Sequence, residues 1–200
     1  MPKQVDHHER RESIARALWR VVDEQGWERA TMREVARAAE VSLGQLQHYF
    51  SSRAEMLAFA MESASDQTSR RVQEGLSALD ETVHPRDVLR LVLLEMLPLR
   101  PESRATSRMN AAYVLEAMHD PSLRRRIGAG LRDQRAVVEQ LIRQAMQDGQ
   151  IGSESDPAVE TDLILALTGL APLLELDAIE PRAALAAIDA HLDRLFLPAP

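Results

Sequence analysis

The sequence predicts an all-α protein with about nine helices. Its apolar residues recur at the three- and four-residue steps of one helix face, as at Ile14, Leu18 and Val22. Strict two-residue alternation, the signature of a half-buried strand, is not sustained anywhere in the chain. Residues that cap or start helices also recur along the chain.

These capping signals place the helices in order. The first helix should end at Gly26, and capping boxes that begin at Thr31, Ser42 and Ser52 start the next three. Later helices should begin with a proline in the first turn, at Pro85, Pro101, Pro121, Pro157 and Pro181. We therefore expect helices at about 9–25, 32–39, 43–50, 53–80, 86–97, 102–118, 121–148, 157–175 and 181–196. Pro172 should kink or end the helix at 157–175.

The composition excludes several classes of protein. The chain has 200 residues, 45% of them hydrophobic, which is enough for a packed core. It contains no cysteine, which excludes disulfides, thiolate metal sites and a cysteine nucleophile. We see no apolar run near the roughly 18 residues of a membrane span and no secretory signal, so we expect a cytoplasmic, nucleoid-associated protein with no membrane partner. The histidines are scattered and no carboxylate pair has an apolar setting, so we expect no metal, no cofactor and no enzymatic activity.

The charge is distributed unevenly around a net value of −7. Residues 1–60 hold 9 Lys and Arg against 9 Asp and Glu, whereas residues 61–200 hold 15 against 22. We therefore expect a domain boundary near residue 60, inside the long fourth helix. The first domain, 1–60, is balanced in charge, and the second, 61–200, is acidic.

Two short predicted helices, 32–39 and 43–50, are separated by only three residues. Three residues cannot fold the second helix back antiparallel, so the pair should cross steeply as a helix-turn-helix, with 9–25 completing a three-helix bundle. The second helix then presents Gln45, Gln47, His48 and Tyr49 outward, which suits a helix laid in the major groove. From the pattern alone, a structural pair of helices with a polar surface is the alternative.

The run from Arg11 to Leu57 resembles the DNA-binding domain of the TetR family of bacterial regulators. The resemblance rests on Ala17, Gly26, Thr31, Val35, Ala36, Ala39, Val41, Ser42, Gly44, Leu46, Tyr49, Phe50, Ser52, Arg53 and Leu57. Segments 117–121, 147–149, 167–170 and 187–192 are similar to the C-terminal domain of betaine/choline-type TetR regulators. The resemblance implies a homodimer that binds a palindromic operator in double-stranded DNA, and a C-terminal helical domain that binds a small ligand and closes the dimer.

The resemblance also implies roles for single residues. Thr31, Tyr49 and Arg53 fall on positions that hold phosphates, and Arg33, Leu43, Gln45 and His48 fall on positions that contact or approach bases. Ser42 caps the second helix, and Gly44 lets its first turn approach the DNA backbone.

Three features of this region leave alternatives open. Gln47 stands where the family usually has a phosphate-binding tyrosine, so it either keeps that contact or reads a base. Glu40 stands where the turn usually has glycine, so it is either strained at positive φ or shifts the turn. The first 11 residues, which include His7 and His8, either reach the DNA as an arm or have no fixed structure.

The two last predicted helices each carry a row of apolar residues that one subunit would not fully cover. We expect these rows to pair with a second subunit in a four-helix bundle, an intrachain core being the alternative. The dimer residues would be Leu163, Leu167, Leu170, Leu174, Ile188, Leu192 and Leu195.

Flexible thioethers and a few polar groups mark the expected ligand pocket. Its residues would be Met61, Leu93, Met96, Arg100, Met109, Asn110, Tyr113 and Met118. Because Tyr113 is the one aromatic residue of this set, a cage for a quaternary ammonium is poorly supplied. The expected effector is therefore an elongated apolar or amphipathic molecule.

These observations predict a ligand-responsive transcriptional repressor whose effector tilts the helix at 53–80 and releases the operator. A transcriptional activator, a DNA-binding protein without a role in transcription, and a helical small-molecule-binding module without DNA specificity are the alternatives.

Overall fold

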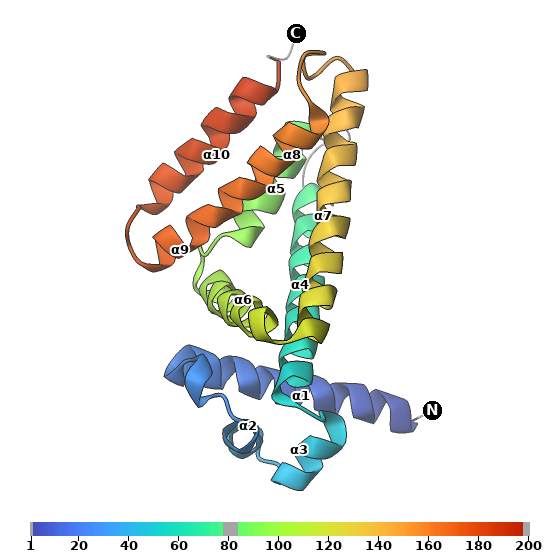
Figure 1. Ribbon diagram of the computed structural model, residues 1–200, viewed down its shortest axis with the longest axis vertical. Coiled ribbons are helices and arrows are strands. Elements are labelled where there is room, and N and C mark those ends of the chain that lie inside the picture. Colours follow the sequence, from blue (N-terminus) through green and yellow to red (C-terminus); the bar gives the residue numbers. More distant parts are fainter. Residues whose placement is uncertain (1, 78–83, 198–200) are drawn as a thin grey trace. The chain divides into compact units, whose positions relative to one another are not determined.

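The computed structural model describes the backbone of residues 2–77 and 84–197, and the side chains of these residues except 2–6, 101 and 102. This part of the chain is built from α-helices and two short 3-10 turns (Figure 1), which confirms the predicted fold class. The elements are α1 Pro2–Gln25, η1 Trp27–Arg29, α2 Met32–Ala38, α3 Leu43–Tyr49, α4 Arg53–Ser77, α5 Pro85–Met96, α6 Pro101–His119, α7 Pro121–Gln147, α8 Pro157–Ala166, η2 Leu167–Gly169, α9 Leu170–Glu175 and α10 Pro181–Leu195.

Two predicted helices have different bounds in the structure. Helix α1 begins at Pro2, about two turns before the predicted start at residue 9. The single helix predicted at 157–175 is interrupted by the 3-10 turn η2, one turn before Pro172. Proline has no N–H for the carbonyl of Thr168 and its ring crowds that carbonyl, so the break falls at the preceding turn. The predicted end of the fourth helix, at residue 80, lies outside the described residues.

The chain divides into two compact units, which we describe separately. Unit 1 comprises residues 1–67 and 105–127, and unit 2 comprises residues 68–104 and 128–200. Helices α4, α6 and α7 each contribute residues to both units. The predicted functional division into 1–60 and 61–200 stays a prediction.

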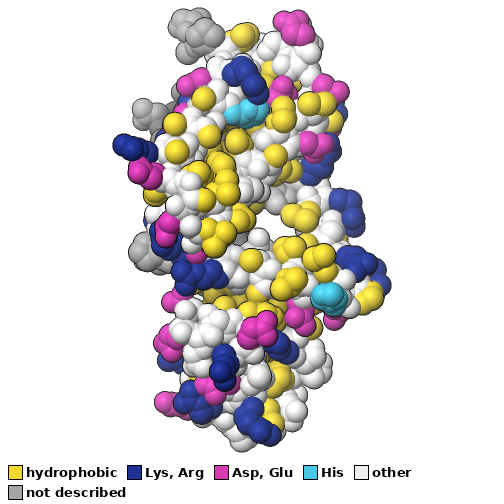
Figure 2. All heavy atoms as spheres, turned by 60° about the vertical axis from the view of Figure 1, so that its left-hand side comes forward, with side chains coloured by type: hydrophobic (Ala, Val, Ile, Leu, Met, Phe, Trp, Pro, Cys, Tyr) yellow, Lys and Arg dark blue, Asp and Glu magenta, His cyan; other side chains and the backbone are white. Residues whose placement is uncertain are grey.

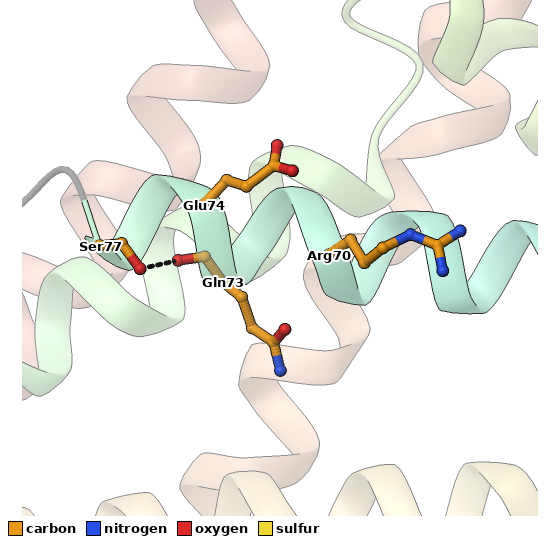
Figure 3. A pocket seen from close by; sticks show the side chains of 4 residues that line it. All are labelled: Arg70, Gln73, Glu74 and Ser77. Atoms are coloured by element: carbon orange, nitrogen blue, oxygen red, sulfur yellow. Dashed lines mark hydrogen bonds between the residues drawn. The ribbon is translucent and has the colours of Figure 1, made fainter.

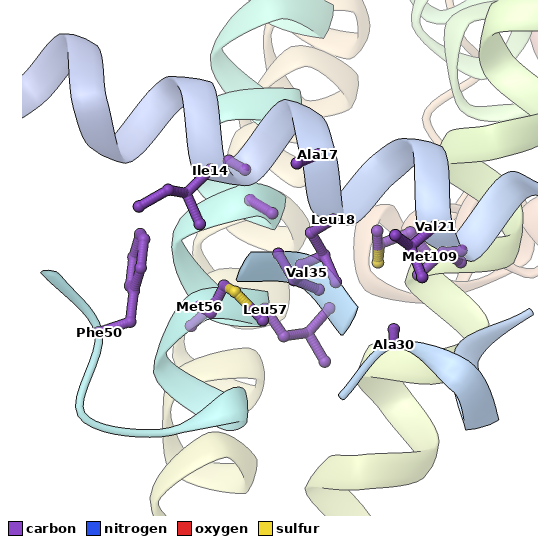
Figure 4. Close-up of a cluster of buried hydrophobic side chains, with 14 of the residues drawn as sticks. Ile14, Ala17, Leu18, Val21, Ala30, Val35, Phe50, Met56, Leu57 and Met109 are labelled. Carbon is purple, nitrogen blue, oxygen red and sulfur yellow. The ribbon is translucent and has the colours of Figure 1, made fainter. Parts of the chain in front are cut away.

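The core of unit 1 forms where α1, α2, α3 and α4 bring their apolar faces together (Figure 4). Ile14, Leu18, Leu46, Phe50 and Leu57 are fully buried there. The predicted three-helix bundle is thus present, with helix α4 packed against it. Residues of α6 and α7 complete this core, namely Met109, Tyr113, Ala117 and Leu123.

The core of unit 2 joins α5, the C-terminal part of α7, and α8 to α10. Its fully buried members include Leu93, Ile142 and Leu192. Ion pairs from α5 to α10 flank this core, with the guanidinium of Arg90 2.6 Å from the carboxylate of Asp189. Burial of apolar side chains on both helices, with paired charges at the rim, holds α10 against α5.

The segment Pro157–Glu175 has an apolar surface that unit 2 leaves uncovered. Apolar side chains gather on the outward face of α8–α10 (Figure 2), and Val159 is 53% and Leu163 43% exposed. By length and composition alone this 19-residue segment could cross a membrane, contrary to the expectation that no run approaches that length. The sequence reading missed it because Glu160 and Asp162 interrupt its apolar run.

Candidate nucleic-acid interface

The turn between α2 and α3 closes with a left-handed residue. The N–H of Val41 donates to the carbonyl of Ala36 at 3.0 Å, and the N–H of Glu40 donates to that of Arg37 at 3.2 Å. This is the Schellman pattern of a helix C-terminus, which places its last residue in the left-handed region. Glu40 has φ of 57°, so the strained alternative is confirmed and the turn keeps its geometry.

Helix α3 buries one face and exposes the other. Leu46 and Phe50, the residue that follows the helix, are fully buried in the core of unit 1. Gln45, Gln47 and His48 lie exposed on the opposite side. The helix contains no acidic residue, so the exposed face carries hydrogen-bonding groups without negative charge.

The start of α3 is open and capped. The Ser42 hydroxyl accepts a hydrogen bond from the N–H of Gln45 at 3.0 Å. No atom outside the immediate backbone lies within 4 Å of the position that a Cβ on Gly44 would take. The first turn of α3 is therefore free for the close approach of a phosphate. Leu43 is half-buried.

Three capping boxes were predicted, and the structure forms one half of each. Besides the bond at Ser42, the N–H groups of Glu34 and Glu55 donate to the hydroxyls of Thr31 and Ser52. In two of the boxes the glutamate has other partners, because Glu34 pairs with Arg37 and Glu55 accepts hydrogen bonds from Ser51. Hydrogen bonds from Ser51, with the nearby Arg11 charge, outweigh burial and lower the pKa of Glu55. Thr31 and Arg33 are exposed on α2, on the described surface of unit 1.

Arg53 has contacts inside the protein that the sequence reading did not foresee. Its guanidinium carbon lies 3.6 Å from the ring centroid of Trp27, and Nη2 donates to the Trp27 carbonyl at 2.5 Å. Desolvation lowers the pKa of Arg53, although Glu116 and Glu28 oppose this shift. Arg53 therefore fixes the turn before α2, and its role as a phosphate contact stays a prediction.

The N-terminal half of α1 packs on the end of α3, which no sequence signal had indicated for His7. The His7 and Tyr49 ring centroids lie 4.8 Å apart, and those of His48 and Tyr49 5.3 Å apart. One turn further on, the Arg11 guanidinium lies 4.6 and 4.4 Å from the ring centroids of Phe50 and Phe59. Arg11 precedes Ile14 and Leu18 at helical spacing, and this signal could have placed it on the inner face. Residues 2–11 are thus helical and not without fixed structure, and their contact with DNA stays a prediction.

The predicted pocket residues are divided between the two units. Met109 and Tyr113 are buried in the core of unit 1, where Met61 also packs. Leu93 is buried in the core of unit 2. Asn110 and Met118 are exposed on α6. The single pocket of eight residues therefore stays a prediction.

Arg100 and Met96 of the predicted pocket have polar partners within unit 2. The Gln134 amide nitrogen lies 3.1 Å from the Met96 sulfur. Arg100 and Arg71 both bind the buried carboxylate of Glu95, with Arg71 Nε at 2.8 Å. Burial raises the pKa of Glu95, but the hydrogen bonds from these two arginines outweigh it and lower that pKa.

Two hollows of the described surface lie elsewhere in unit 2. The first, of about 420 Å³, is lined by Arg70, Gln73, Glu74 and Ser77. All four come from α4 and their side chains diverge from the helix (Figure 3), so they do not enclose a ligand. The second, of about 500 Å³, is lined by residues of α7, namely Ala136, Val137, Gln140, Leu141 and Gln144.

The predicted dimer residues divide between the core and the surface. Leu174, Ile188, Leu192 and Leu195 are buried within unit 2, so these four pack inside one chain. Leu167 and Leu170 are half-buried against the same core, and Leu163 is exposed. The buried residues of α9 and α10 thus face the core of unit 2, whereas Leu163 of α8 lies on the exposed side.

A steep pair of short helices, capped at the second helix and polar on its outer face, defines the class of helix-turn-helix DNA-binding proteins. Residues 14–59 match the family described as bacterial regulatory proteins, tetR family. Residues 85–197 match the family described as BetI-type transcriptional repressor, C-terminal. The chain belongs to the TetR family of bacterial transcriptional regulators.

Several known proteins are similar to this chain. The HTH-type transcriptional regulator PksA of Bacillus subtilis is 40% identical over 119 residues, or 60% of this chain and 57% of PksA. The HTH-type transcriptional regulator BetI of Stenotrophomonas maltophilia is 30% identical over 127 residues, or 62% of this chain and 63% of BetI. The chain thus spans less than two thirds of the curated relatives it matches.

Solved structures match over almost the whole chain. A transcriptional regulator from Rhodococcus sp. Rha1 is 28% identical with a TM-score of 0.80, covering 95% of this chain and 99% of the other. A regulator from Saccharomonospora viridis, solved in complex with choline, has a TM-score of 0.82 at 16% identity, covering 96% and 100%. The second likeness concerns the fold alone.

Proposed function

We propose that the protein is a homodimeric transcriptional repressor that binds a palindromic operator through α3 and releases it when a small effector binds. The observation that carries the proposal is the outward face of α3. Gln45, Gln47 and His48 are exposed there on a helix without acidic residues, behind an open first turn. Amide and imidazole groups can both donate to and accept from base edges in the major groove.

Binding-site selection from a random duplex library, at fixed physiological salt, tests the DNA-binding part. We expect an inverted repeat bound about 10³-fold or more tightly than a scrambled duplex. Gln45→Ala and His48→Ala should relax the sequence preference, whereas the control Gln73→Ala, an exposed glutamine on α4, should not. A wild-type protein that enriches no duplex would contradict specific binding and favour a ligand-binding module without DNA specificity.

A reporter gene next to the selected site separates the transcriptional alternatives. Repression predicts lower expression when the protein is present and recovery when effector is added. Higher expression would make the protein an activator, and no change would indicate a DNA-binding role outside transcription.

The outward face of α8–α10 supports the homodimer. Val159 and Leu163 are exposed on α8, and on α10 the exposed positions include Ala183, Ala187 and Ala190, which allow close helix packing. We expect Leu163→Glu to give monomers in light scattering, because a carboxylate would be buried without a partner. The control Val137→Glu replaces a still more exposed apolar residue, on α7, and should leave the dimer intact. An intact Leu163→Glu dimer would overturn this part of the proposal.

The composition of unit 2 bears on the effector. Phe196 is the single aromatic residue in the sequence ranges of unit 2, and it is buried. A cage of aromatic rings for a quaternary ammonium group therefore lacks its side chains there. We propose an elongated apolar or amphipathic effector. Decanoate and choline test this proposal when their effects on thermal unfolding and on release of the operator are compared. Release by choline alone would contradict it.

Helices α4, α6 and α7 continue from unit 2 into unit 1, which supports coupling through them. A differential binding energy of about 1–3 kcal/mol changes operator affinity about 5- to 150-fold. Two recognition helices must lie about 34–36 Å apart to enter successive major grooves. We propose that effector binding tilts α4 and changes this spacing.

A further inference from the structure

The C-terminal end of α3 carries a cluster of three rings from two helices. His7 of α1 lies against Tyr49, and Tyr49 lies against His48. The His7 and His48 ring centroids are 6.3 Å apart. Tyr49 is half-buried, whereas His7 and His48 are exposed. The rings therefore sit at the edge of the surface that α3 turns to solvent.

The position of His7 is fixed by the next turn of α1. His7 and Arg11 are four residues apart and so lie on one face of the helix. Arg11 is held over the rings of Phe50 and Phe59 and pairs with Glu55 at 3.4 Å. This anchor ties the N-terminal half of α1 to the junction of α3 and α4.

We propose that His7 is a positioning residue of the DNA-binding surface, whose ring holds Tyr49 and His48 in place for contact with the operator. The inference rests on the proposed function, since it assigns His7 a part in operator binding. A side chain that is ordered before binding loses less conformational entropy when it meets DNA. Without His7, the Tyr49 ring loses its ring contact with α1.

The neighbouring histidine provides a matched control. The His8 ring centroid lies 6.0 Å from that of Phe59, and His8 Nε2 lies 3.4 Å from a carboxylate oxygen of Glu12. These contacts are with α4 and with α1 itself. His8→Ala therefore removes an exposed imidazole of the same helix while leaving the ring cluster on α3.

The test measures affinity for the selected operator and for a scrambled duplex over a range of salt concentrations. We expect His7→Ala to weaken operator binding about 3- to 10-fold, the range of one aromatic contact. His7→Phe keeps a ring against Tyr49 and should restore binding to within about twofold. His8→Ala should bind like wild type. In a double-mutant cycle, His7→Ala should have little further effect once Tyr49 is alanine.

The outcomes separate this inference from the function on which it rests. A wild-type protein without sequence preference would overturn both. Wild-type preference with unchanged binding by His7→Ala, or additive effects in the cycle, would overturn the inference alone. The inference would also fail if His7→Phe and His7→Ala lost equal affinity for both duplexes and flattened the salt dependence of binding. That result would make His7 a direct phosphate contact. Thermal unfolding of each variant shows whether unit 1 stays folded.

Discussion

Replacing Glu40 by glycine should stabilise unit 1. The residue has φ of 57°, a conformation in which an L side chain crowds its own backbone. Relief of this strain is worth about 1–2 kcal/mol. The greater chain entropy of glycine in the unfolded state offsets about 0.5–1 kcal/mol of it. We therefore expect a net gain of up to about 1.5 kcal/mol in the free energy of unfolding, with about 0.75 kcal/mol as the midpoint.

Tryptophan fluorescence during urea unfolding measures this gain selectively. Both tryptophans of the chain, Trp19 and Trp27, lie in unit 1 together with Glu40. Glu40→Ala removes the charge and keeps the strain, so it should not reproduce the gain. Glu40→Asn should recover part of it, because asparagine tolerates the left-handed region. Equal stabilisation by Ala and Gly would refute the reasoning and point to the carboxylate charge instead.

Three further predictions concern stability. Arg53→Ala should lower the free energy of unfolding of unit 1 by about 1–2 kcal/mol in the same assay, through loss of the contacts with Trp27; an unchanged midpoint would deny Arg53 this structural role. The pKa of Glu95 is lower in the folded protein than its usual value of 4.5, so its carboxylate stabilises the fold above pH 4.5. This contribution is lost as the pH falls through the pKa of the folded state. Glu95→Gln should therefore be less stable at neutral pH and flatten the acid dependence of stability below pH 4.5 in circular dichroism, whereas exposed Glu74→Gln should behave like wild type. Asp156→Ala removes the cap on the first amides of α8 and should lower the free energy of unfolding by about 1 kcal/mol in calorimetry. An unchanged free energy of unfolding would mean that water satisfies these amides as well as Asp156 does.

Local chemistry made most helix boundaries predictable. Pro157 and Pro181 begin α8 and α10 as expected, and the hydroxyls of Thr31 and Ser42 cap α2 and α3. The positive φ of Glu40 was one of the two alternatives that the glycine usual at this position of the family left open. These features depend on residues within one turn of each other, so the sequence contains the whole interaction.

The candidate site was less predictable where it depends on distant partners. The exposed face of α3 follows from the spacing of Leu46 and Phe50. The contact of His7 with Tyr49, by contrast, joins residues 42 positions apart. Arg53 likewise reaches back 26 positions to Trp27. No periodicity within one helix encodes such pairs.

The sequence by itself determined the helical class, the helix-turn-helix and the polar face of α3, because helical spacing and capping are local. Only the tertiary structure decided which apolar rows became core and which stayed exposed. Ile188 and Leu192 pack inside unit 2, whereas Leu163 stays on the surface. The tertiary structure also decided that Met109 packs in the core of unit 1. Apolar burial is non-directional, so an apolar stripe specifies that it will be covered but not by which neighbour.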